Sequence, residues 1–326
     1  MKTICGKQIS ERIPCVATIG TFDGIHLGHR LILEHVVGTA RLKKVRSVVI
    51  TFDILPQEFF RRKPHLKDRA RPKPFTGYLT DREQKTALIA SCGVDRLWFL
   101  KTEESLLDLK ARDFFAYLSR SLDIRMIIVG SDFRFGHGSH GNVGTLQKIA
   151  AEQGFEVRAL RKKRMGGEEV SSSRIRALIR AGRLPQAATL LGRCVCVRGI
   201  VVQGQGIGSR ALVATANIDT GTYCMPDRGI YAGACVALGA VYPCVISIGT
   251  RPTVVSGGAL CTEVHIIGFK KNIVGKKVTV FFFEKIRSEK KFPSLADLKA
   301  AIRKDIVLAT SKYSTARSLL PQELVF

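Results

Sequence analysis

Two histidines three residues apart, His26 and His29, stand in a glycine-rich stretch that reads GTFDGIHLGH from Gly20. Imidazoles can donate hydrogen bonds to phosphate oxygens on which negative charge develops. Zinc binding is the other chemistry open to the pair, since histidines at positions i and i+3 can share one face of a helix. No nearby cysteine or third histidine completes a tetrahedral ligand set, so we favour phosphate chemistry over zinc.

We expect a strand before this stretch and a helix after it, which is an arrangement that binds phosphate. Residues 16–19 form a short apolar run, typical of a buried parallel strand, and a helical pattern begins at Gly28. A helix that starts directly after a strand directs unpaired backbone N–H groups and the positive end of its dipole at the turn. The sequence therefore predicts a phosphate-binding loop between this strand and this helix.

The motif resembles the signature of the HxGH nucleotidyltransferase superfamily, which transfers nucleotidyl groups from nucleoside triphosphates. With Phe22, Asp23 and Gly24 in place, it is similar to the adenylyltransferase domain of bacterial bifunctional riboflavin kinase/FAD synthetases. The resemblance implies that His26 and His29 are catalytic. It also implies an ATP-binding group in the same stretch: Gly20, Phe22, Asp23, Gly24 and Gly28.

Three later segments extend the resemblance. The apolar runs 47–52 and 126–129 predict strands that deliver TFD and GSDFRFG to the ligand-binding edge of a doubly wound sheet. The segment SSSRIR offers hydroxyls that cap a helix and arginines that suit phosphate. The resemblance implies that one group contacts the flavin: Phe52, Asp53, Asp132, Phe133 and Arg134. A second group is implied to bind ATP: Ser171, Ser172, Ser173, Arg174 and Arg176.

From Cys194 onward the pattern changes to short β-branched and aromatic runs separated by glycine, proline and asparagine or aspartate turns. This spacing predicts an antiparallel barrel, followed by a helix over 295–308. We therefore expect two domains. Residues 1–190 form an α/β nucleotidyltransferase domain with a Rossmann-like parallel sheet, and residues 191–326 form a β-barrel with a terminal helix.

The second half resembles the riboflavin kinase domain of the same family, through ATAN at 214–217, GIYA at 229–232, SIGTRPT at 247–253 and the terminal segment from Ile286. The resemblance implies that Thr215 and Asn217 bind ATP and Mg²⁺, for which small oxygen ligands are suited. It also implies that Glu263 is the catalytic base that takes a proton from a ribityl hydroxyl. Residues 208–214 lack the glycine and proline that the family has there. The alternative is therefore a monofunctional FAD synthetase whose kinase-like domain is inactive.

Composition narrows the choice of compartment and partner. No apolar run has the length of a membrane span and the N-terminus lacks a signal-peptide core, while the nine cysteines show no disulfide spacing. We expect a cytoplasmic protein with reduced thiols and no membrane partner. A net charge of +25 suits anionic small substrates or nucleic acid, and it is also what the composition of a basic proteome would give. The densest basic run, 161–164, has no interleaved aromatics, which makes nucleic acid the less favoured partner. The partners that the resemblance implies are small molecules, namely ATP, riboflavin, FMN and FAD, with Mg²⁺.

Overall fold

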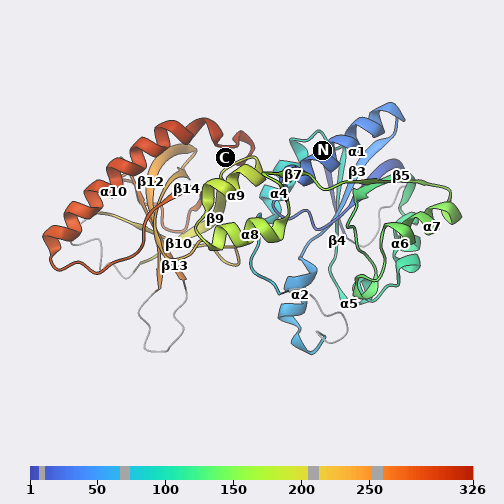
Figure 1. The fold of residues 1–326 in the computed structure, drawn as a ribbon, viewed down its shortest axis with the longest axis horizontal. Helices are drawn as coiled ribbons and strands as arrows, with labels where there is room; N and C mark the ends of the chain where they lie inside the picture. The colour runs from blue at the N-terminus through green and yellow to red at the C-terminus, as the bar shows by residue number, and fades with distance from the viewer. Residues whose placement is uncertain (7–11, 67–73, 205–212, 251–259, 326) are drawn as a thin grey trace. The chain divides into compact units, whose positions relative to one another are not determined.

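The structure is a computed structural model that describes residues 1–6, 12–66, 74–204, 213–250 and 260–325 (Figure 1). Contacts divide the chain into two compact units, Met1–Thr76 with Arg82–Val170, and Gly77–Asp81 with Ser171–Phe326. Three stretches singled out in the sequence lie wholly or partly outside the described residues. They are the basic, proline-bearing stretch 61–74, whose lack of periodicity predicts an irregular loop, the residues before Thr215 and the end of SIGTRPT.

The described residues of the first unit form a six-stranded parallel sheet in the order β1-β4-β3-β2-β5-β6. The strands are β1 (Lys2–Cys5), β2 (Ile13–Ile19), β3 (Arg46–Phe52), β4 (Arg96–Leu100), β5 (Leu122–Gly130) and β6 (Glu156–Leu160). The longer helices are α1 (Leu27–Leu42), α2 (Pro56–Arg62), α4 (Arg82–Ala90), α6 (Ala111–Ser119) and α7 (Val143–Gln153). The short elements are η1 (Pro64–Leu66), α5 (Glu104–Leu107), η2 (His137–Ser139) and the hairpin β7 (Arg164–Met165) and β8 (Glu168–Glu169).

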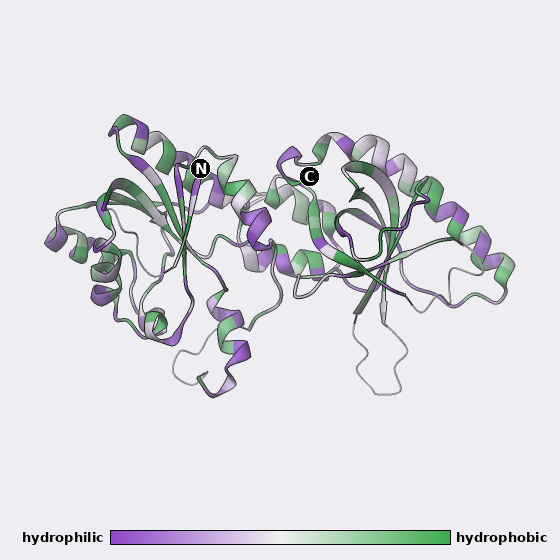
Figure 2. Cartoon of the chain, turned by 180° about the vertical axis from the view of Figure 1, so that it is seen from behind, coloured by the Kyte–Doolittle hydropathy of each residue, from purple (hydrophilic) through white to green (hydrophobic). Residues whose placement is uncertain are grey.

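Alternate residues of the strands build two cores, one on each face of the sheet. On one face α6 and α7 pack through Phe114, Phe115 and Leu146 against residues such as Ala17. On the other face Val36 and its neighbours on α1 join Val16, Met126 and Ile128. In Figure 2 the strands are coloured mainly hydrophobic, whereas the helices mix both colours. The central strands β2, β3, β4 and β5 are buried on both faces, as continuous apolar runs predict, whereas the edge strands β1 and β6 are largely exposed.

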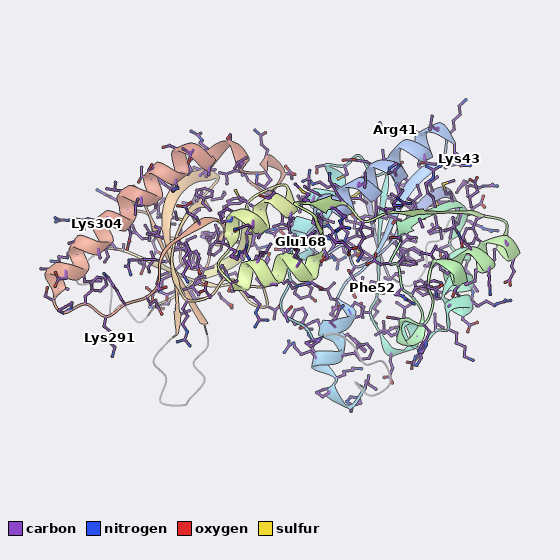
Figure 3. The ribbon with its side chains drawn as sticks, viewed as in Figure 1. Arg41, Lys43, Phe52, Glu168, Lys291 and Lys304 are labelled. Atoms are coloured by element: carbon purple, nitrogen blue, oxygen red, sulfur yellow. The ribbon has the colours of Figure 1, made fainter. Side chains whose placement is uncertain are left out.

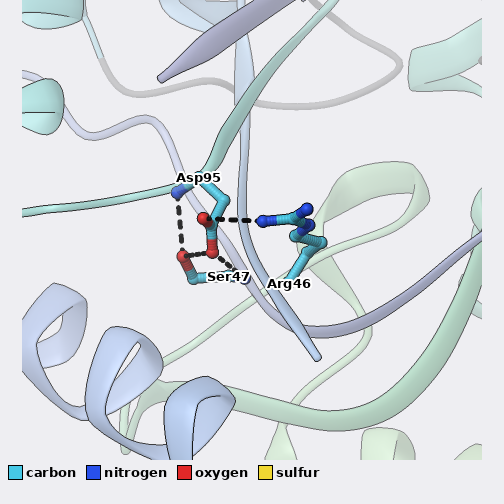
Figure 4. Close-up of polar contacts among 3 residues, drawn as sticks. All are labelled: Arg46, Ser47 and Asp95. Carbon is cyan, nitrogen blue, oxygen red and sulfur yellow. Dashed lines mark hydrogen bonds and ion pairs between the residues drawn. The ribbon is translucent and has the colours of Figure 1, made fainter. Parts of the chain in front are cut away.

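A polar cluster fixes the amino ends of β3 and β4 (Figure 4). The Ser47 N–H and hydroxyl donate to Asp95 Oδ2 at 2.9 and 2.7 Å, and the Asp95 N–H donates to Ser47 Oγ at 2.9 Å. Arg46 Nη1 lies 3.5 Å from Asp95 Oδ1. Burial alone would raise the pKa of Asp95, but the Ser47 hydrogen bonds and Arg46 lower it below the usual value.

The described residues of the second unit form a closed antiparallel barrel in the order β10-β13-β12-β11-β14-β9. Its strands are β9 (Val195–Val202), β10 (Ala216–Asp219), β11 (Gly229–Ala237), β12 (Ala240–Thr250), β13 (Leu260–Ile266) and β14 (Lys277–Arg287). Its helices are α8 (Ser172–Arg180), α9 (Leu184–Leu191), α10 (Leu295–Ala316), η3 (Arg317–Leu319) and η4 (Gln322–Leu324).

Helix α10 packs on β11, β12 and β14 and is tied to the barrel by an ion pair. Its N-cap is Ser294, whose Oγ accepts from the Asp297 N–H at 3.1 Å. Asp305, on the same helix, accepts hydrogen bonds from the guanidinium group of Arg287, the last residue of β14. The cap starts the helix and the ion pair fixes its distance from the barrel.

The segment Gly77–Asp81 belongs to the second unit although it lies far ahead of it in the sequence. Tyr78 forms a parallel bridge with Tyr223. The Tyr78 N–H donates to the Thr222 carbonyl at 2.9 Å, and the Cys224 N–H donates to the Tyr78 carbonyl at 2.8 Å. The second unit is therefore built from two separate pieces of chain.

The expected fold class is confirmed: a parallel sheet, an antiparallel barrel and a terminal helix. The strands predicted at 16–19, 47–52 and 126–129 lie within β2, β3 and β5, and α10 continues to Ala316, beyond the expected end at 308. Structure that was not predicted includes β1, β10 and α2. The expectation of an irregular stretch from Arg61 is wrong as far as Leu66, because α2 and η1 lie there. The domain boundary at residue 190 stays a prediction; α8 and α9 group with the second unit by contacts.

Candidate active sites

The first candidate site lies where the order of the parallel strands changes direction. Strand β2 pairs with β3 on one side and with β5 on the other, so the loops that follow β2 and β5 leave the same edge side by side. These loops carry GTFDGIH and GSDFRFG. A switch point of this kind is where open α/β sheets bind ligands. The fold thus brings together the two motifs that the sequence placed there.

The loop after β2 holds an uncommon backbone shape. Phe22, Gly24 and Ile25 have φ angles of 45°, 90° and 37°. A left-handed conformation is unfavourable for a β-branched residue such as Ile25 and persists only where its surroundings enforce it. Both Phe22 and Ile25 are buried, which supplies that enforcement. The loop is therefore held in one shape before any ligand arrives.

His26 and His29 meet at the start of α1. His26 is the N-cap residue, and its Nδ1 accepts a hydrogen bond from the His29 N–H at 3.2 Å. The two rings are stacked with centroids 3.6 Å apart, and the Phe22 ring meets His29 edge-on at 5.1 Å. Because Nδ1 is an acceptor, the proton of the neutral His26 ring lies on Nε2. The predicted pair is thus assembled at a helix N-terminus.

Lys85 on α4 lies beneath this loop and was not predicted from the sequence. Its Nζ donates to the Thr21 carbonyl at 2.9 Å, and Thr51 Oγ1 donates to the same oxygen at 3.1 Å. Burial lowers the pKa of Lys85 to about 8, although Asp23 and Asp53 favour its charged form. The signal was available, because Lys85 shares the apolar stripe of its helix with Leu88 and Ile89.

The predicted flavin residues after β3 have structural partners. Asp53 Oδ1 accepts the N–H groups of Ile54 and Thr102 at 2.7 and 2.8 Å. Phe52, labelled in Figure 3, is half-buried and packs against the core. Asp53 thus ties the carboxyl end of β3 to that of β4, and both residues shape the sheet edge. Their contact with flavin stays a prediction.

The loop after β5 carries both charge and aromatic surface. Asp132 and Arg134 are exposed, and the Phe133 ring stacks on that of Phe135 with centroids 5.3 Å apart. Lys162 Nζ lies 2.9 Å from Asp132 Oδ2 and 2.8 Å from Glu169 Oε2. Hydrogen bonds to Glu169 and Asp132 raise the pKa of Lys162, so this lysine is a fixed cation near the loop.

The segment 171–176 forms the start of α8 in the second unit. Ser171 is the N-cap, and its Oγ accepts the Arg174 N–H at 3.3 Å, while Ser172 and Ser173 lie in the first turn. Arg176 Nε donates to the Gly77 carbonyl at 2.8 Å. Ser171 therefore caps α8, as predicted. The contact of residues 171–174 and 176 with ATP stays a prediction.

The second candidate site lies on the outer face of the barrel. Asn217 on β10 and Ser247 on β12 both pair directly with Glu263 on β13, so their side chains share one face. The residues adjacent to Glu263 along β13 are buried in the barrel, which places Glu263 itself on the outside. Thr215 Oγ1 lies 3.5 Å from Glu263 Oε2, and Cys261 Sγ donates to Asn217 Oδ1 at 3.5 Å. The fold thus brings Thr215, Asn217 and Glu263 together.

A hollow of about 630 Å³ opens further along this face of the barrel. Ser247 pairs with Ile230 on β11, and Ile230 pairs with Arg287 on β14; the last two line the hollow. Its full lining is Ile230, Arg287, Glu289, Lys290, Lys291, Phe292, Pro293, Ser294, Leu295 and Leu298. The hollow is wide and open, and its lining mixes apolar, aromatic and charged groups.

No group of three or more histidine, cysteine, aspartate or glutamate side chains is placed to hold a metal ion in the parts of the chain that the structure describes. Over the same residues, no helix combines the length and the apolar composition that crossing a membrane requires.

Known proteins resemble the chain over almost its whole length. Family models match at residues 8–174 for FAD synthetase and at residues 191–313 for riboflavin kinase. A bifunctional riboflavin kinase/FMN adenylyltransferase of Escherichia coli is 34% identical over 314 residues, covering 95% of this chain and 97% of that protein. The protein of that name from Pseudomonas fluorescens is 34% identical over 300 residues, covering 92% and 93%.

A solved structure agrees with the fold of the whole chain. The crystal structure titled as a macrolide-efflux protein from Streptococcus pneumoniae has a TM-score of 0.82 and 26% sequence identity, covering 94% of this chain and 98% of that one. Both family models and both relatives point to one assignment. The chain belongs to the family of bifunctional riboflavin kinase/FMN adenylyltransferases.

Proposed function

We propose that the chain makes FAD from riboflavin in two ATP-dependent steps. The C-terminal domain, residues 191–326, phosphorylates riboflavin to FMN. The N-terminal domain, residues 1–190, joins FMN to the AMP of a second ATP and releases pyrophosphate. The observation that carries the proposal is the presence of two chemically distinct sites: stacked histidines at a helix N-terminus in one unit, and a carboxylate on the same barrel face as a ligand-sized hollow in the other.

Adenylyl transfer follows from positioning and charge stabilisation. The helix N-terminus of α1 and the Nε2 proton of His26 favour a phosphate whose negative charge increases during transfer, and His29 lies against the same ring. A Cβ atom at Gly28 would lie 3.2 Å from the His26 ring, so glycine preserves the stacked arrangement. No covalent intermediate is required, because FMN supplies its own phosphate oxygen as the nucleophile.

The kinase step uses Glu263 as a base. A carboxylate within hydrogen-bond reach of the terminal ribityl hydroxyl takes its proton as the oxygen attacks the γ-phosphate of ATP. Ile230, which lines the hollow, lies two strands from Glu263, or about 10 Å at the usual strand spacing. A flavin ring in the hollow can therefore extend its ribityl chain along the outer face to Glu263.

Thr215 and Asn217 fit the Mg²⁺ ion that such a kinase requires. They provide a hydroxyl and an amide oxygen close to Glu263, and Mg²⁺ prefers few protein oxygens together with water and phosphate. When bound, the ion would neutralise the charge of the ATP phosphates. The two residues would hold that ion, while Glu263 orients and deprotonates the substrate hydroxyl.

The cysteines support a cytoplasmic location. All nine lie in described residues and none forms a disulfide. Burial raises the pKa of Cys15, Cys196 and Cys235 to about 12, so these thiols stay protonated and unreactive at neutral pH. Such thiols suit a reducing compartment. The proposed partners are small molecules rather than nucleic acid or a membrane.

A product assay tests the proposed function. Purified protein is incubated with ATP and Mg²⁺ and either riboflavin or FMN, and the flavins are then separated. FAD from both mixtures is the expected result. FAD from FMN alone would support the alternative of a monofunctional FAD synthetase with an inactive kinase-like domain. No FAD from either mixture would refute the proposal.

A further inference from the structure

A buried cation, Lys85, lies under the phosphate-binding loop and is hydrogen-bonded to its backbone. Lys85 is 4% exposed, and its Nζ is directed at the Thr21 carbonyl, 2.9 Å away. A lysine that is almost fully buried must be compensated by nearby anions or acceptors. Lys85 has no role in the adenylyl-transfer step proposed for His26 and His29, so that step does not explain why a lysine is buried here.

The first contribution of Lys85 is to the orientation of one peptide. Lys85 and Thr51 both donate to the Thr21 carbonyl oxygen, so this oxygen is held toward them. In a planar trans peptide the C=O of one residue and the N–H of the next point in opposite directions. The Phe22 N–H is therefore directed away from Lys85. This orientation fixes the first peptide of a loop whose next residues have positive φ angles.

The second contribution is to charge. Asp23 is 1% exposed, and Asp23 and Asp53 are the anionic groups that act on Lys85, while Arg82 is the like charge. The guanidinium group of Arg82 lies over the Phe99 ring, 4.4 Å from its centroid. The two positive charges of Lys85 and Arg82 thus equal in number the two negative charges of Asp23 and Asp53. Without Lys85 the negative charge of Asp23 and Asp53 would be less compensated, and the additional negative charge would repel a triphosphate.

We propose that Lys85 is a positioning residue for adenylyl transfer, which holds the Thr21–Phe22 peptide in its phosphate-binding orientation and offsets the negative charge of the buried Asp23 side chain in the same loop. This inference rests on the proposed function of the N-terminal domain. Lys85 acts through the loop and does not contact the reacting atoms.

The proposal has a pH signature. Burial lowers the pKa of Lys85 to about 8, so its charge is lost as the pH rises through that value in the nucleotide-free protein. Because kcat/KM reports on groups of the free enzyme, kcat/KM for ATP should fall above about pH 8. Arginine keeps its charge over this whole range. The Lys85→Arg variant should therefore keep its kcat/KM to higher pH.

The test compares Lys85→Met and Lys85→Arg with the same methionine substitution at Lys148, an exposed lysine on α7. In Lys85→Met, kcat for FAD formation from FMN should fall roughly 100-fold, the usual result of misplacing a reacting group by about 1 Å. Backbone amides of residues 20–26 should exchange hydrogen faster in the ligand-free variant. Riboflavin phosphorylation in the same chain reports that the protein is folded. Lys148→Met should match the wild type in every measurement.

Either of two results would overturn the proposal. One is a Lys85→Met variant with the wild-type rate and unchanged amide exchange over residues 20–26; the other is a Lys85→Arg variant with the wild-type pH profile. Failure of the proposed function is distinguishable, because the wild-type protein would then form no FAD from FMN. The exchange measurement would still decide whether Lys85 orders the loop.

Discussion

Replacing Asp305 by alanine should release α10 from the barrel and weaken the binding of riboflavin. Arg287 Nε donates to both oxygens of Asp305 at 3.1 and 3.2 Å, and Nη2 donates to Oδ2 at 2.8 Å. The Asp305 side chain is 6% exposed and that of Arg287 is 22% exposed. Arg287 also lines the hollow, so the ion pair connects the position of α10 with the shape of the proposed flavin site.

The magnitude follows from this geometry. Removing one partner of a buried ion pair usually destabilises a protein by about 3–5 kcal/mol. Arg287 keeps some access to water and also donates to the Ser288 carbonyl at 3.3 Å, so we expect a smaller loss. A loss of about 2–3 kcal/mol corresponds to a fall in Tm of about 4–12 °C for a unit of this size.

Thermal unfolding and steady-state kinetics measure the two effects. The KM for riboflavin should rise, whereas FAD formation from FMN should be unaffected. Lys304→Ala is the matched control, because Lys304 is the preceding residue of α10 and is exposed (Figure 3). Asp305→Asn, which keeps the shape of the side chain, should give an intermediate loss. An Asp305→Ala protein with unchanged Tm and unchanged riboflavin KM would refute the reasoning.

Three further predictions test other parts of the structure. His29→Ala should lower FAD formation from FMN by roughly 100-fold or more and spare riboflavin phosphorylation; parallel loss of both activities would contradict the division of roles. Glu263→Ala should do the reverse by a similar factor, measured as FMN formed from riboflavin. Asp95→Asn should lower the free energy of unfolding by about 1–2 kcal/mol at pH 7, after allowance for a side chain that is 39% exposed. The folded-state pKa of Asp95 is lowered, so the advantage of the wild type is fully present above the unfolded pKa near 4 and shrinks as the pH falls through the folded value. Urea unfolding at pH 7 and pH 3 checks this sign, and a difference that grows in acid would contradict it.

The sequence predicted those elements whose residues carry their own signal. The short, β-branched apolar runs before Phe52 and after Arg125 predict buried strands, and the motif around His26 predicts a helix N-terminus directly after the strand at 16–19. By contrast, β10 is four residues long and half polar, and its strand state depends on pairing with β9 and β13. The local sequence of β10 carries no information about β9 and β13, so this strand could not be predicted from it.

The motifs of both candidate sites were predicted from the sequence, but the residues that hold those motifs in place were not. Lys85 was missed because a lysine in a helix normally lies in solvent, and only its place on the apolar stripe indicated otherwise. The hollow was missed because its walls come from β11, β14 and α10, which are brought together by the barrel and by Arg287 with Asp305. The capping role of Ser171 needs only its own helix, and the sequence identified it.

The bridge between Tyr78 and Tyr223 has a consequence for the order of events during synthesis. Tyr223 follows Tyr78 by 145 residues in the sequence. At a translation rate of about 5–20 residues per second, Tyr78 leaves the ribosome roughly 7 to 30 s before its partner exists. The parallel sheet of the first unit can therefore fold before the partners of residues 77–81 have been synthesised. The second unit is complete only after residues 77–81 have paired with residues 222–224. A gene fragment that begins at residue 171 or 191 would encode the barrel without it, and the Thr222 carbonyl and Cys224 N–H would lose their hydrogen-bond partners.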